Sequence, residues 1–340
     1  MTHSSSLPEH PLLSFTIPTY NRATFLGRLL AVLLQDLKAE DRVEVIVSDN
    51  ASTDDTSAVV AAYQQQGLPI RYLRNETNLG PDFNILQCYE NAGGVYTWIF
   101  GDDDLIVPGT MKRILDALSP QQYDLVFVRA YNSQNKTAPR SIFTSASDLE
   151  LEKAEDLARH VHVFFTFISG MIINKKRISS LPHKPFDSLL GSYLVQLGPI
   201  YTMLNHHRRS LLIRTPLVAA TSNRSVKYAL YGIFGPTLDR ITREWVDKKS
   251  IQQTIINGTI QTFFPSFLLL SKMSVVSSIS ENPHEILSPC FCRNFRYWLF
   301  DYPICTLPIP FAKIWFLTVK VINKVDKLFG NPLVRLWVKQ

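Results

Sequence analysis

Four times between residues 12 and 118, a short apolar run precedes a segment with helical periodicity, and this alternation limits the possible folds more than any other feature. The apolar runs at 12–18, 43–48, 69–74 and 95–100 predict strands. The segments at 23–35, 56–66 and 78–91 predict helices, and Pro108 opens another helical pattern. Because strands that alternate with helices form a mostly parallel sheet covered on both faces, we expect an α/β, Rossmann-like fold.

Polar residues follow each predicted strand at the point where its apolar run ends. Right-handed crossovers bring the carboxyl ends of parallel strands to one edge, where ligands bind, so these residues should lie together. They are Thr19, Tyr20 and Asn21, then Asp49, Asn50 and Ser52, then Arg74 and Asn75, and finally Asp102, Asp103 and Asp104. An aromatic ring and carboxylates after two strands suit a nucleotide diphosphate. Two local alternatives stay open, because residues 19–22 can form a simple turn and residues 49–55 can cap a helix.

Asp102, Asp103 and Asp104 directly follow the aromatic-rich run and one glycine. Adjacent carboxylates repel one another, and a bound divalent cation offsets this repulsion most simply. Mg²⁺ or Mn²⁺ would be coordinated by one or two protein carboxylates, with waters and phosphate oxygens at its other positions. A substrate diphosphate is therefore a suitable ligand. The same triplet can instead be a solvated loop or a set of charges at a helix N-terminus.

Four motifs, in order, resemble the family 2 glycosyltransferases, which have the GT-A fold. They are Ile-Pro-Thr-Tyr-Asn-Arg at 17–22, Val-Ile-Val-Ser-Asp-Asn-Ala-Ser-Thr-Asp-Asp-Thr at 45–56, Asn78 with Gly80 and Asn84, and Phe-Gly-Asp-Asp-Asp at 100–104. The resemblance covers about residues 12–120. Gly-Asp-Asp-Asp, with Ile-Ser-Gly-Met-Ile-Ile at 168–173, more narrowly resembles abequosyltransferase-like enzymes of bacterial O-antigen synthesis.

This resemblance implies roles for the motif residues. Tyr20 and Asp49 would hold the nucleotide base, since a ring can stack on a pyrimidine and a carboxylate can accept from uracil N3–H or from the cytosine amine. UDP and CDP therefore both stay open. The expected nucleotide-sugar-binding residues are Thr19, Tyr20, Arg22, Asp49, Asn78, Asp102 and Asp103, and the expected ligands of Mg²⁺ or Mn²⁺ are Asp103 and Asp104, either of which can be the main one.

The acceptor side is expected after a strand at 123–131 and a polar loop at 132–150. Residues 163–173 resemble the family's acceptor-side strand. Inverting members usually carry an acidic base shortly after it, often as Glu-Asp, and residues 186–193 lack that pair. Asp187 is our candidate base because it is the only carboxylate between Asp156 and Asp239, with a helix N-cap as its alternative role. Further options for the base are His206, His207 and Arg224.

Charge is distributed unevenly along the chain. Residues 1–120 contain 8 Lys and Arg against 15 Asp and Glu, which leaves 27 against 14 for residues 121–340. Aromatic and basic residues are interleaved from 293 to 322, where Asp301, Lys313 and three prolines interrupt any membrane span. This pattern favours a membrane headgroup interface over nucleic acid, and a helix pair packed on the catalytic domain is the alternative. We expect a GT-A domain at 1–215 and a helical, basic, membrane-associated region at 216–340.

The expected location is the cytoplasm, peripheral on the inner face of the cytoplasmic membrane. The first ten residues lack a basic segment followed by an apolar one, which argues against secretion. The four cysteines show no paired spacing typical of zinc sites, which indicates reduced thiols.

The sequence thus predicts a glycosyltransferase. It would move a sugar, with a dideoxyhexose such as abequose as one option, from a CDP- or UDP-linked donor to a hydroxyl of a lipid-linked O-antigen or other surface-glycan intermediate. Two other classes stay open. A nucleotidyltransferase would use a similar sheet and metal but usually has a glycine-rich basic loop after its first strand, which residues 19–22 lack. A non-catalytic membrane-associated nucleotide-sugar-binding protein would need no base.

Overall fold

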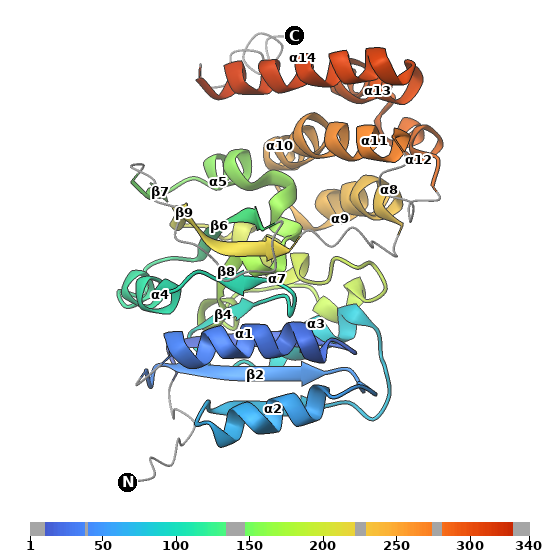
Figure 1. Ribbon diagram of the computed structural model, residues 1–340. Coiled ribbons are helices and arrows are strands. Elements are labelled where there is room, and N and C mark those ends of the chain that lie inside the picture. The colour runs from blue at the N-terminus through green and yellow to red at the C-terminus, as the bar shows by residue number, and fades with distance from the viewer. Residues whose placement is uncertain (1–10, 38–39, 134–146, 222–228, 274–280, 329–340) are drawn as a thin grey trace. The chain divides into compact units, whose positions relative to one another are not determined.

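The computed structural model describes residues 11–37, 40–133, 147–221, 229–273 and 281–328 of the 340-residue protein. The chain divides into two compact units, Met1–Ser222 and Asn223–Gln340. The described strands all belong to the first unit, and the described part of the second unit is helical (Figure 1). The expected division after residue 215 falls inside the strand β9 (Ser210–Thr221), and the first unit continues to Ser222.

The first half of the first unit has the expected alternation of strands and helices. Strands β1 (Leu13–Thr19), β2 (Val43–Asp49), β3 (Ile70–Arg74) and β4 (Tyr96–Ile99) are parallel, in the order β3-β2-β1-β4. Helices α1 (Ala23–Asp36), α2 (Thr56–Gln65) and α3 (Pro81–Asn91) connect them. The chain steps from β1 to β3 in one direction and then returns through α3 to the other side of β1. The strand order therefore reverses between β1 and β4, which is where open α/β sheets bind their ligands.

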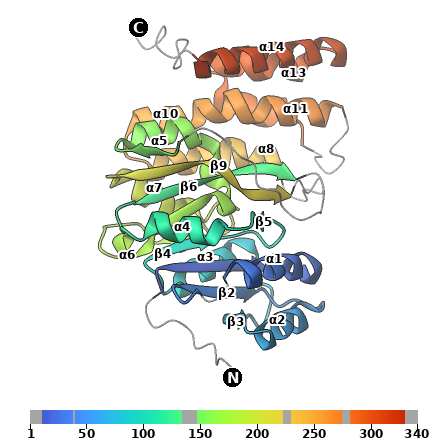
Figure 2. The same ribbon diagram turned by 60° about the vertical axis from the view of Figure 1, so that its left-hand side comes forward.

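The second half of this unit makes the sheet mixed. Strand β8 (Met171–Asn174) pairs antiparallel with β4 and with β6 (Leu125–Ser133), and β9 runs parallel to β6. Strands β5 (Leu105–Ile106) and β7 (Leu149–Leu151) pair antiparallel with β9. The helices here are α4 (Thr110–Leu118), α5 (Ala154–Val161), α6 (Lys175–Ile178) and α7 (Leu197–Asn205) (Figure 2). The expected α/β sheet with flanking helices is confirmed, and its parallel part is limited to β1–β4 and the β6–β9 pair.

The strand predicted over 163–173 is wrong for its first part. Residues His162–Thr166 and Ile168–Gly170 form 3₁₀ turns, and only Met171–Asn174 is a strand. Val163 and Phe165 are buried, whereas Phe164 between them is 47% exposed. This inside–outside alternation is the same as that of a half-buried strand, so the pattern does not distinguish the two structures. The strand predicted at 123–131 corresponds to β6, and residues 134–146 of the predicted polar loop lie outside the described residues.

A cluster of three buried aromatic rings supports the strand end that leads into the aspartate triplet. Phe15 of β1 lies 5.3 Å from Trp98 of β4 and 4.9 Å from Phe100, measured between ring centroids, and Trp98 and Phe100 are 5.2 Å apart. All three side chains are fully buried. Edge-to-face contacts add to the stability that apolar burial gives these rings. The cluster fixes β4 beside β1 immediately before Gly101.

The second unit consists of helices, some continued by π-helical turns at Ile233–Thr237, Thr259–Phe263 and Tyr297–Asp301. Its helices are α8 (Leu230–Gly232), α9 (Leu238–Trp245), α10 (Lys249–Gly258), α11 (Phe264–Lys272), α12 (Pro283–Phe291), α13 (Tyr302–Thr306) and α14 (Ile309–Leu328). Of the interleaved aromatic residues, Tyr297 and Phe300 are buried in this unit, whereas Phe295 and Trp298 are exposed. In the described part of the chain, no helix combines the length and the hydropathy needed to span a bilayer.

Candidate active site

Thr19 and Asp102 meet at the point where the strand order reverses. Thr19 ends β1 and Asp102 follows β4, and the Thr19 hydroxyl donates to Asp102 Oδ2 over 2.7 Å. Arg22 lies three residues further along and its Nη1 is 3.0 Å from Asp102 Oδ1 and 2.7 Å from Asp103 Oδ2. The structure therefore brings together four of the predicted residues, which come from two motifs about 80 positions apart in the sequence.

Asp104 and Asp103 differ in their surroundings. Asp104 is buried, its Oδ2 accepts the Ser169 hydroxyl over 2.6 Å, and its Oδ1 accepts the backbone N–H of Thr221 over 2.9 Å. The side chain of Asp103 is 20% exposed, and apart from Arg22 no partner of its carboxylate is found among the described residues. Both oxygens of Asp104 thus accept a hydrogen bond inside the protein, whereas Asp103 Oδ1 has no partner among the residues that the structure describes.

Burial changes the acidity of two carboxyl groups in the triplet. Removal from water raises the pKa of Asp102 to about 6, although the Arg22 charge acts to lower it. It also raises the pKa of Asp104 to about 7, against the hydrogen bond from Ser169. Repulsion from Asp103 contributes to both shifts in the same direction. A positive charge beside Asp103 would offset that repulsion.

Asp49 ends β2 at the same edge but is completely buried. Its Oδ1 accepts the N–H of Ser52 over 2.8 Å, and its Oδ2 accepts the Tyr72 hydroxyl over 2.5 Å. Arg74 Nε lies 3.5 Å from the same Oδ2, and the Arg74 side chain is 53% exposed. Burial and the carboxylate together raise the pKa of Tyr72 above its usual value, so Tyr72 remains a donor. The side chain of Tyr20, by contrast, is 42% exposed.

A set of asparagines joins the ends of β2 and β3 to the start of α3. Asn50 Nδ2 donates to Asn78 Oδ1 over 2.7 Å, and the N–H of Leu79 donates to Asn50 Oδ1 over 2.9 Å. Asn84 receives the Ser48 hydroxyl over 2.6 Å and donates to the Ser48 carbonyl over 2.9 Å. Asn78 therefore shapes the loop that leads into α3, whereas Asn84, within α3, fixes this helix to the end of β2.

The segment that contains Asp187 packs beside α3. Asp187 is exposed and lies in a 3₁₀ turn, Phe186–Leu189. It does not cap α7, which begins at Leu197, ten residues after Asp187. The Phe186 ring contacts Tyr89 of α3, with centroids 5.5 Å apart. The buried carboxylate of Asp82, in the first turn of α3, accepts the N–H of Tyr193 over 2.7 Å. Asp82 therefore anchors the end of this segment to the edge that carries Asn78.

The other proposed bases are not brought to the triplet. His206 and His207 follow α7 and precede β9, and His207 Nε2 lies 2.6 Å from Ser210 Oγ. Ser210 pairs with Leu125 at the beginning of β6, which is the amino-terminal edge of the parallel strands. The triplet lies at the carboxyl-terminal edge. Arg224 lies outside the described residues.

Three residues of this arrangement were not assigned to it from the sequence. Ser169 belongs to a motif quoted for the resemblance, but nothing in the pattern showed that it would contact Asp104. Tyr72 is part of an apolar run, and its hydroxyl gave no signal of a carboxylate partner. Thr221 Oγ1 donates to the Asp103 carbonyl over 2.5 Å from 118 positions away, which no local signal could predict.

The residues around Asp103 suit a hard cation that keeps most of its own ligands. No group of three or more His, Cys, Asp or Glu side chains able to hold a metal ion is found in the part of the chain that the structure describes. Mg²⁺ is usually held by only one or two carboxylates together with waters and phosphate oxygens. Asp103, with Asp102 beside it, meets that limited requirement, whereas a metal cage made entirely by the protein is not present among the described residues.

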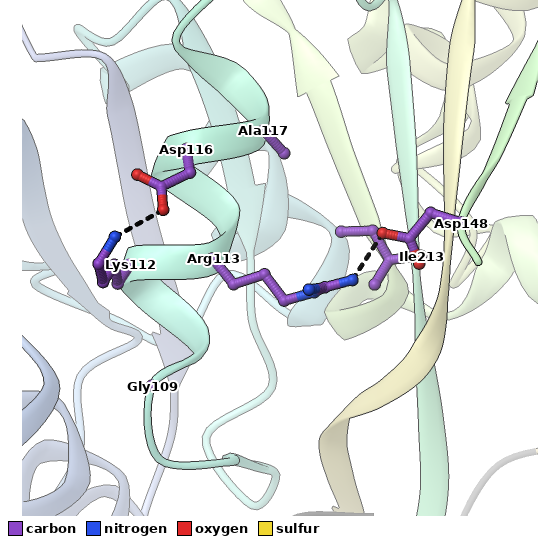
Figure 3. Close-up of a pocket in the computed structure, with 7 residues that line it drawn as sticks. All are labelled: Gly109, Lys112, Arg113, Asp116, Ala117, Asp148 and Ile213. Carbon is purple, nitrogen blue, oxygen red and sulfur yellow. Dashed lines mark hydrogen bonds and ion pairs between the residues drawn. The ribbon is translucent and has the colours of Figure 1, made fainter. Parts of the chain in front are cut away.

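A cavity of about 320 Å³ lies elsewhere, beside α4 and β9. Figure 3 shows that its charged side chains point toward one another: Lys112 Nζ lies 2.7 Å from Asp116 and Arg113 Nη2 lies 2.7 Å from Asp148. Two ion pairs satisfied within the protein leave little reason for a charged ligand to bind there. The candidate site therefore remains the edge that carries Asp102 and Asp103.

Comparison with protein families and curated proteins shows what the first unit is similar to. Residues 14–178 match the model of Glycosyl transferase family 2. Abequosyltransferase RfbV of Salmonella typhimurium is 32% identical over 178 residues, which is 49% of this chain and 54% of that protein. A GalNAc(5)-diNAcBac-PP-undecaprenol beta-1,3-glucosyltransferase of Campylobacter jejuni is 27% identical over 174 residues, 50% of this chain and 55% of that protein. The chain thus spans about half the length of these relatives.

A solved structure shares the fold. TarS 1–349 of S. aureus, crystallised with UDP-GlcNAc, matches 86% of this chain and 90% of its own with a TM-score of 0.57 and 16% sequence identity. This likeness confirms the expected GT-A architecture, with its mixed sheet and flanking helices.

Proposed function

Because residues 14–178 form a Glycosyl transferase family 2 domain, we propose that the protein is a glycosyltransferase that uses a nucleotide-diphospho-sugar as donor. The observation that carries this proposal is the meeting of Thr19, Arg22, Asp102 and Asp103 where the strand order reverses. The Arg22 guanidinium and these carboxylates can hold a ribose and a diphosphate, and Asp103 Oδ1, which has no partner within the described ranges, can bind a metal. The abequosyltransferase and the glucosyltransferase to which this chain is similar are both named as enzymes that transfer sugars.

The nucleotide would be held by residues from the ends of all four parallel strands. Tyr20 offers an exposed ring for stacking on the base. Asp49 Oδ2 faces both Tyr72 and Arg74, whereas Oδ1 accepts only the Ser52 N–H among the described residues, so Oδ1 keeps an acceptor position for a base N–H. Asn78 shapes the adjoining loop, and Thr19, Arg22 and Asp102 lie where the ribose and the diphosphate follow.

We assign the metal role to Asp103 rather than to Asp104. Asp104 uses both carboxylate oxygens to bind Ser169 and Thr221, so its task is to hold the loop in place. Mg²⁺ or Mn²⁺ would neutralise the charge that develops on the departing nucleoside diphosphate. Arg22 already spans Asp102 and Asp103, so it sets the direction of both carboxylates before the donor arrives.

Asp187 is our candidate for the group that accepts the proton of the attacking hydroxyl. Its side chain is exposed. The neighbouring Phe186 packs on Tyr89 in the last turns of α3, and Tyr193, six residues after Asp187, is fixed to the carboxyl-terminal edge through Asp82. A general base contributes most when it is held within hydrogen-bond reach of the hydroxyl. A fixed segment meets this condition better than a free loop does.

The acceptor we propose is a lipid-linked glycan at the inner face of the cytoplasmic membrane. Support comes from the names of the relatives, one of which acts on an undecaprenol-linked glycan, and from the basic and aromatic character of residues 293–322. The donor would be a CDP- or UDP-linked sugar, and abequose is one option because of the likeness to an abequosyltransferase. The protein would bind this membrane peripherally.

The test is incubation of the purified protein with a panel of nucleotide-diphospho-sugars, with and without Mn²⁺ or Mg²⁺. Metal-dependent release of the nucleoside diphosphate is the expected result, and the donor that gives it identifies the base and the sugar. Release of pyrophosphate from a nucleoside triphosphate and a sugar phosphate would show a nucleotidyltransferase instead. Tight nucleotide-sugar binding with no release, in the presence of membrane extracts that supply acceptors, would show a binding protein.

A further inference from the structure

Helix α14 has one face fixed against its own unit. Ala312 and Val319 are buried, and Trp315 Nε1 donates to the Leu299 carbonyl over 2.9 Å. Asn323 and Gln261 exchange two hydrogen bonds, because Gln261 Nε2 donates to Asn323 Oδ1 over 2.8 Å and Asn323 Nδ2 donates to the Gln261 carbonyl over 3.0 Å. These contacts settle the rotation of the helix about its axis. The side chains that point outward are therefore determined.

The outward face of α14 is apolar. Ile314, Leu317 and Val321 are 62%, 60% and 62% exposed, and Val325 is 40% exposed. Their spacing of three and four residues places them in one stripe, roughly opposite Ala312 and Val319 at about 100° per residue. Figures 1 and 2 both draw α14 along α11 and α13, and no other described helix of this unit covers its outer side. Single exposed apolar residues are ordinary on protein surfaces, but a continuous stripe marks an interaction site.

A row of lysines runs beside the apolar stripe. Lys313, Lys320 and Lys324 are exposed and lie along one line of the helix, roughly 90° from the centre of the stripe. Lys320 Nζ lies over the Phe316 ring, 4.6 Å from its centroid, so its alkyl chain follows the helix surface while its charge stays in water. The helix sequence contains only one acidic residue, Asp326, against four lysines. The charge beside the stripe is therefore positive along the whole helix.

We propose that α14 lies in the plane of an anionic membrane surface, with Ile314, Leu317 and Val321 inserted and Lys313, Lys320 and Lys324 at the lipid phosphates. An apolar stripe flanked by lysines is what binds helices parallel to such a surface. A second copy of the chain is a poorer occupant, because a two-fold contact would place lysines near lysines with a single acidic side chain per helix to balance them. This membrane contact rests on the peripheral location in the proposed function and names the helix responsible, but it depends on α14 alone and not on sugar transfer.

The experiment measures partitioning of the full-length protein into vesicles of phosphatidylcholine, with or without phosphatidylglycerol, by flotation. Neither vesicle contains a glycan acceptor, so the outcome is independent of glycosyltransferase activity. The variant Ile314→Gln, Leu317→Gln, Val321→Gln should lose binding to both kinds of vesicle. The variant Lys313→Gln, Lys320→Gln, Lys324→Gln should bind anionic vesicles roughly a hundredfold less tightly at low salt, about fivefold per lysine, and neutral vesicles unchanged.

The matched control is Lys112→Gln, Lys153→Gln, Lys249→Gln, which removes the same charge from exposed sites elsewhere and should bind as the unmodified protein does. Circular dichroism checks that each variant is folded, which we expect because the substituted side chains are exposed. Unchanged binding by the apolar variant, or an equal loss in the control, would overturn the proposal. So would a dimer in light scattering that the apolar variant dissociates, if the unmodified protein leaves the vesicles unbound.

Discussion

The Ser169 hydroxyl donates to Asp104 Oδ2 over 2.6 Å, and Ser169 Oγ also accepts the backbone N–H of Gly101 over 2.9 Å. One buried hydroxyl thus holds both ends of the loop that carries Asp102 and Asp103. Ser169 therefore ties the loop to the segment before β8, while Thr19, Arg22 and Thr221 hold the loop from other parts of the chain.

Replacement of Ser169 by alanine should lower the free energy of unfolding by about 1–3 kcal/mol, because a buried N–H and a buried carboxylate oxygen lose their partner. Chemical denaturation measures this change. Nucleotide release should also fall, since the carboxylates would no longer be held in one direction. The exposed Ser179→Ala provides the control, and equal stability of the two variants would contradict the role of Ser169.

Asp103→Asn should reduce metal-dependent nucleotide release by about a hundredfold or more, because a metal contributes several kcal/mol of charge stabilisation. Asp104→Asn should retain far more activity, since the Ser169 hydroxyl can turn to accept from the new amide. Removal of the metal with EDTA should abolish release in the unmodified protein, and added Mn²⁺ should restore it. Equal activity of Asp103→Asn and the exposed control Asp116→Asn would exclude Asp103 as the ligand.

Asp49→Ala should weaken binding of the preferred nucleoside diphosphate by about 1.5–3 kcal/mol, the range for a hydrogen bond to a charged group. Isothermal titration calorimetry with UDP and CDP measures it. Tyr72→Phe removes one donor to Asp49 but leaves the carboxylate, so it should have a smaller effect. Asp55→Ala tests a nearby exposed carboxylate and should change nothing. The base-binding role fails if Asp49→Ala binds both nucleotides as tightly as that control does.

Asp187→Asn should leave nucleotide binding unchanged and reduce transfer to an acceptor by about 10²–10⁴-fold, the usual contribution of a general base. Asp156→Asn, a change at another partly exposed carboxylate, should have no such effect. Parallel measurements of nucleotide affinity and of product formation separate the two functions. Full transfer by Asp187→Asn would show that another group accepts the proton.

Asp301 gives a pH-dependent prediction for the second unit. It is fully buried, and both carboxylate oxygens lack a partner among the described residues. Burial raises the pKa of Asp301 well above its usual 3.8, so the protonated form favours folding, and this contribution is lost as the pH rises above 3.8 toward the folded-state pKa. Asp301→Asn should therefore melt at a higher temperature than the unmodified protein at neutral pH, and the difference should shrink as the pH falls toward 3.8. Scanning fluorimetry across this pH range measures the melting temperatures, with the exposed Asp247→Asn as control. Equal pH dependence of the melting temperature in the two variants would contradict this role of Asp301.

The strands β1–β4 and their helices could be predicted because each has a strong local signal. A buried apolar run or a helical period fits within a window of about 18 residues or fewer. Strand β9 gave no such signal, since Pro216 interrupts Ser210–Thr221, and the structure accommodates it with a shift in register opposite Val128 and Ala130. A proline fits a strand mainly at such irregularities.

Part of the candidate site could also be predicted from the sequence, and part could not. Asp102 and Thr19 could be placed together because the topology of parallel strands brings their carboxyl ends to one edge. The different surroundings of Asp103 and Asp104 could not be predicted, because Ser169 and Thr221 reach the loop through tertiary structure. Likewise the burial of Asp49 beneath Tyr72 depends on how two neighbouring strands pair, which the sequence pattern does not state.

The hydrogen bonds from Thr221 to Asp103 and Asp104 also set the order of events during biosynthesis. A nascent chain that has emerged as far as Asp104 carries all four motifs, yet Thr221 is more than a hundred residues away from leaving the ribosome. Domains fold as units and generally from the N-terminus during translation, so the aspartate loop can reach its final form only near the end of that process. A fragment that ends at residue 215 would contain every recognisable motif and still lack Thr221, which holds the carboxylate of Asp104 and the backbone carbonyl of Asp103.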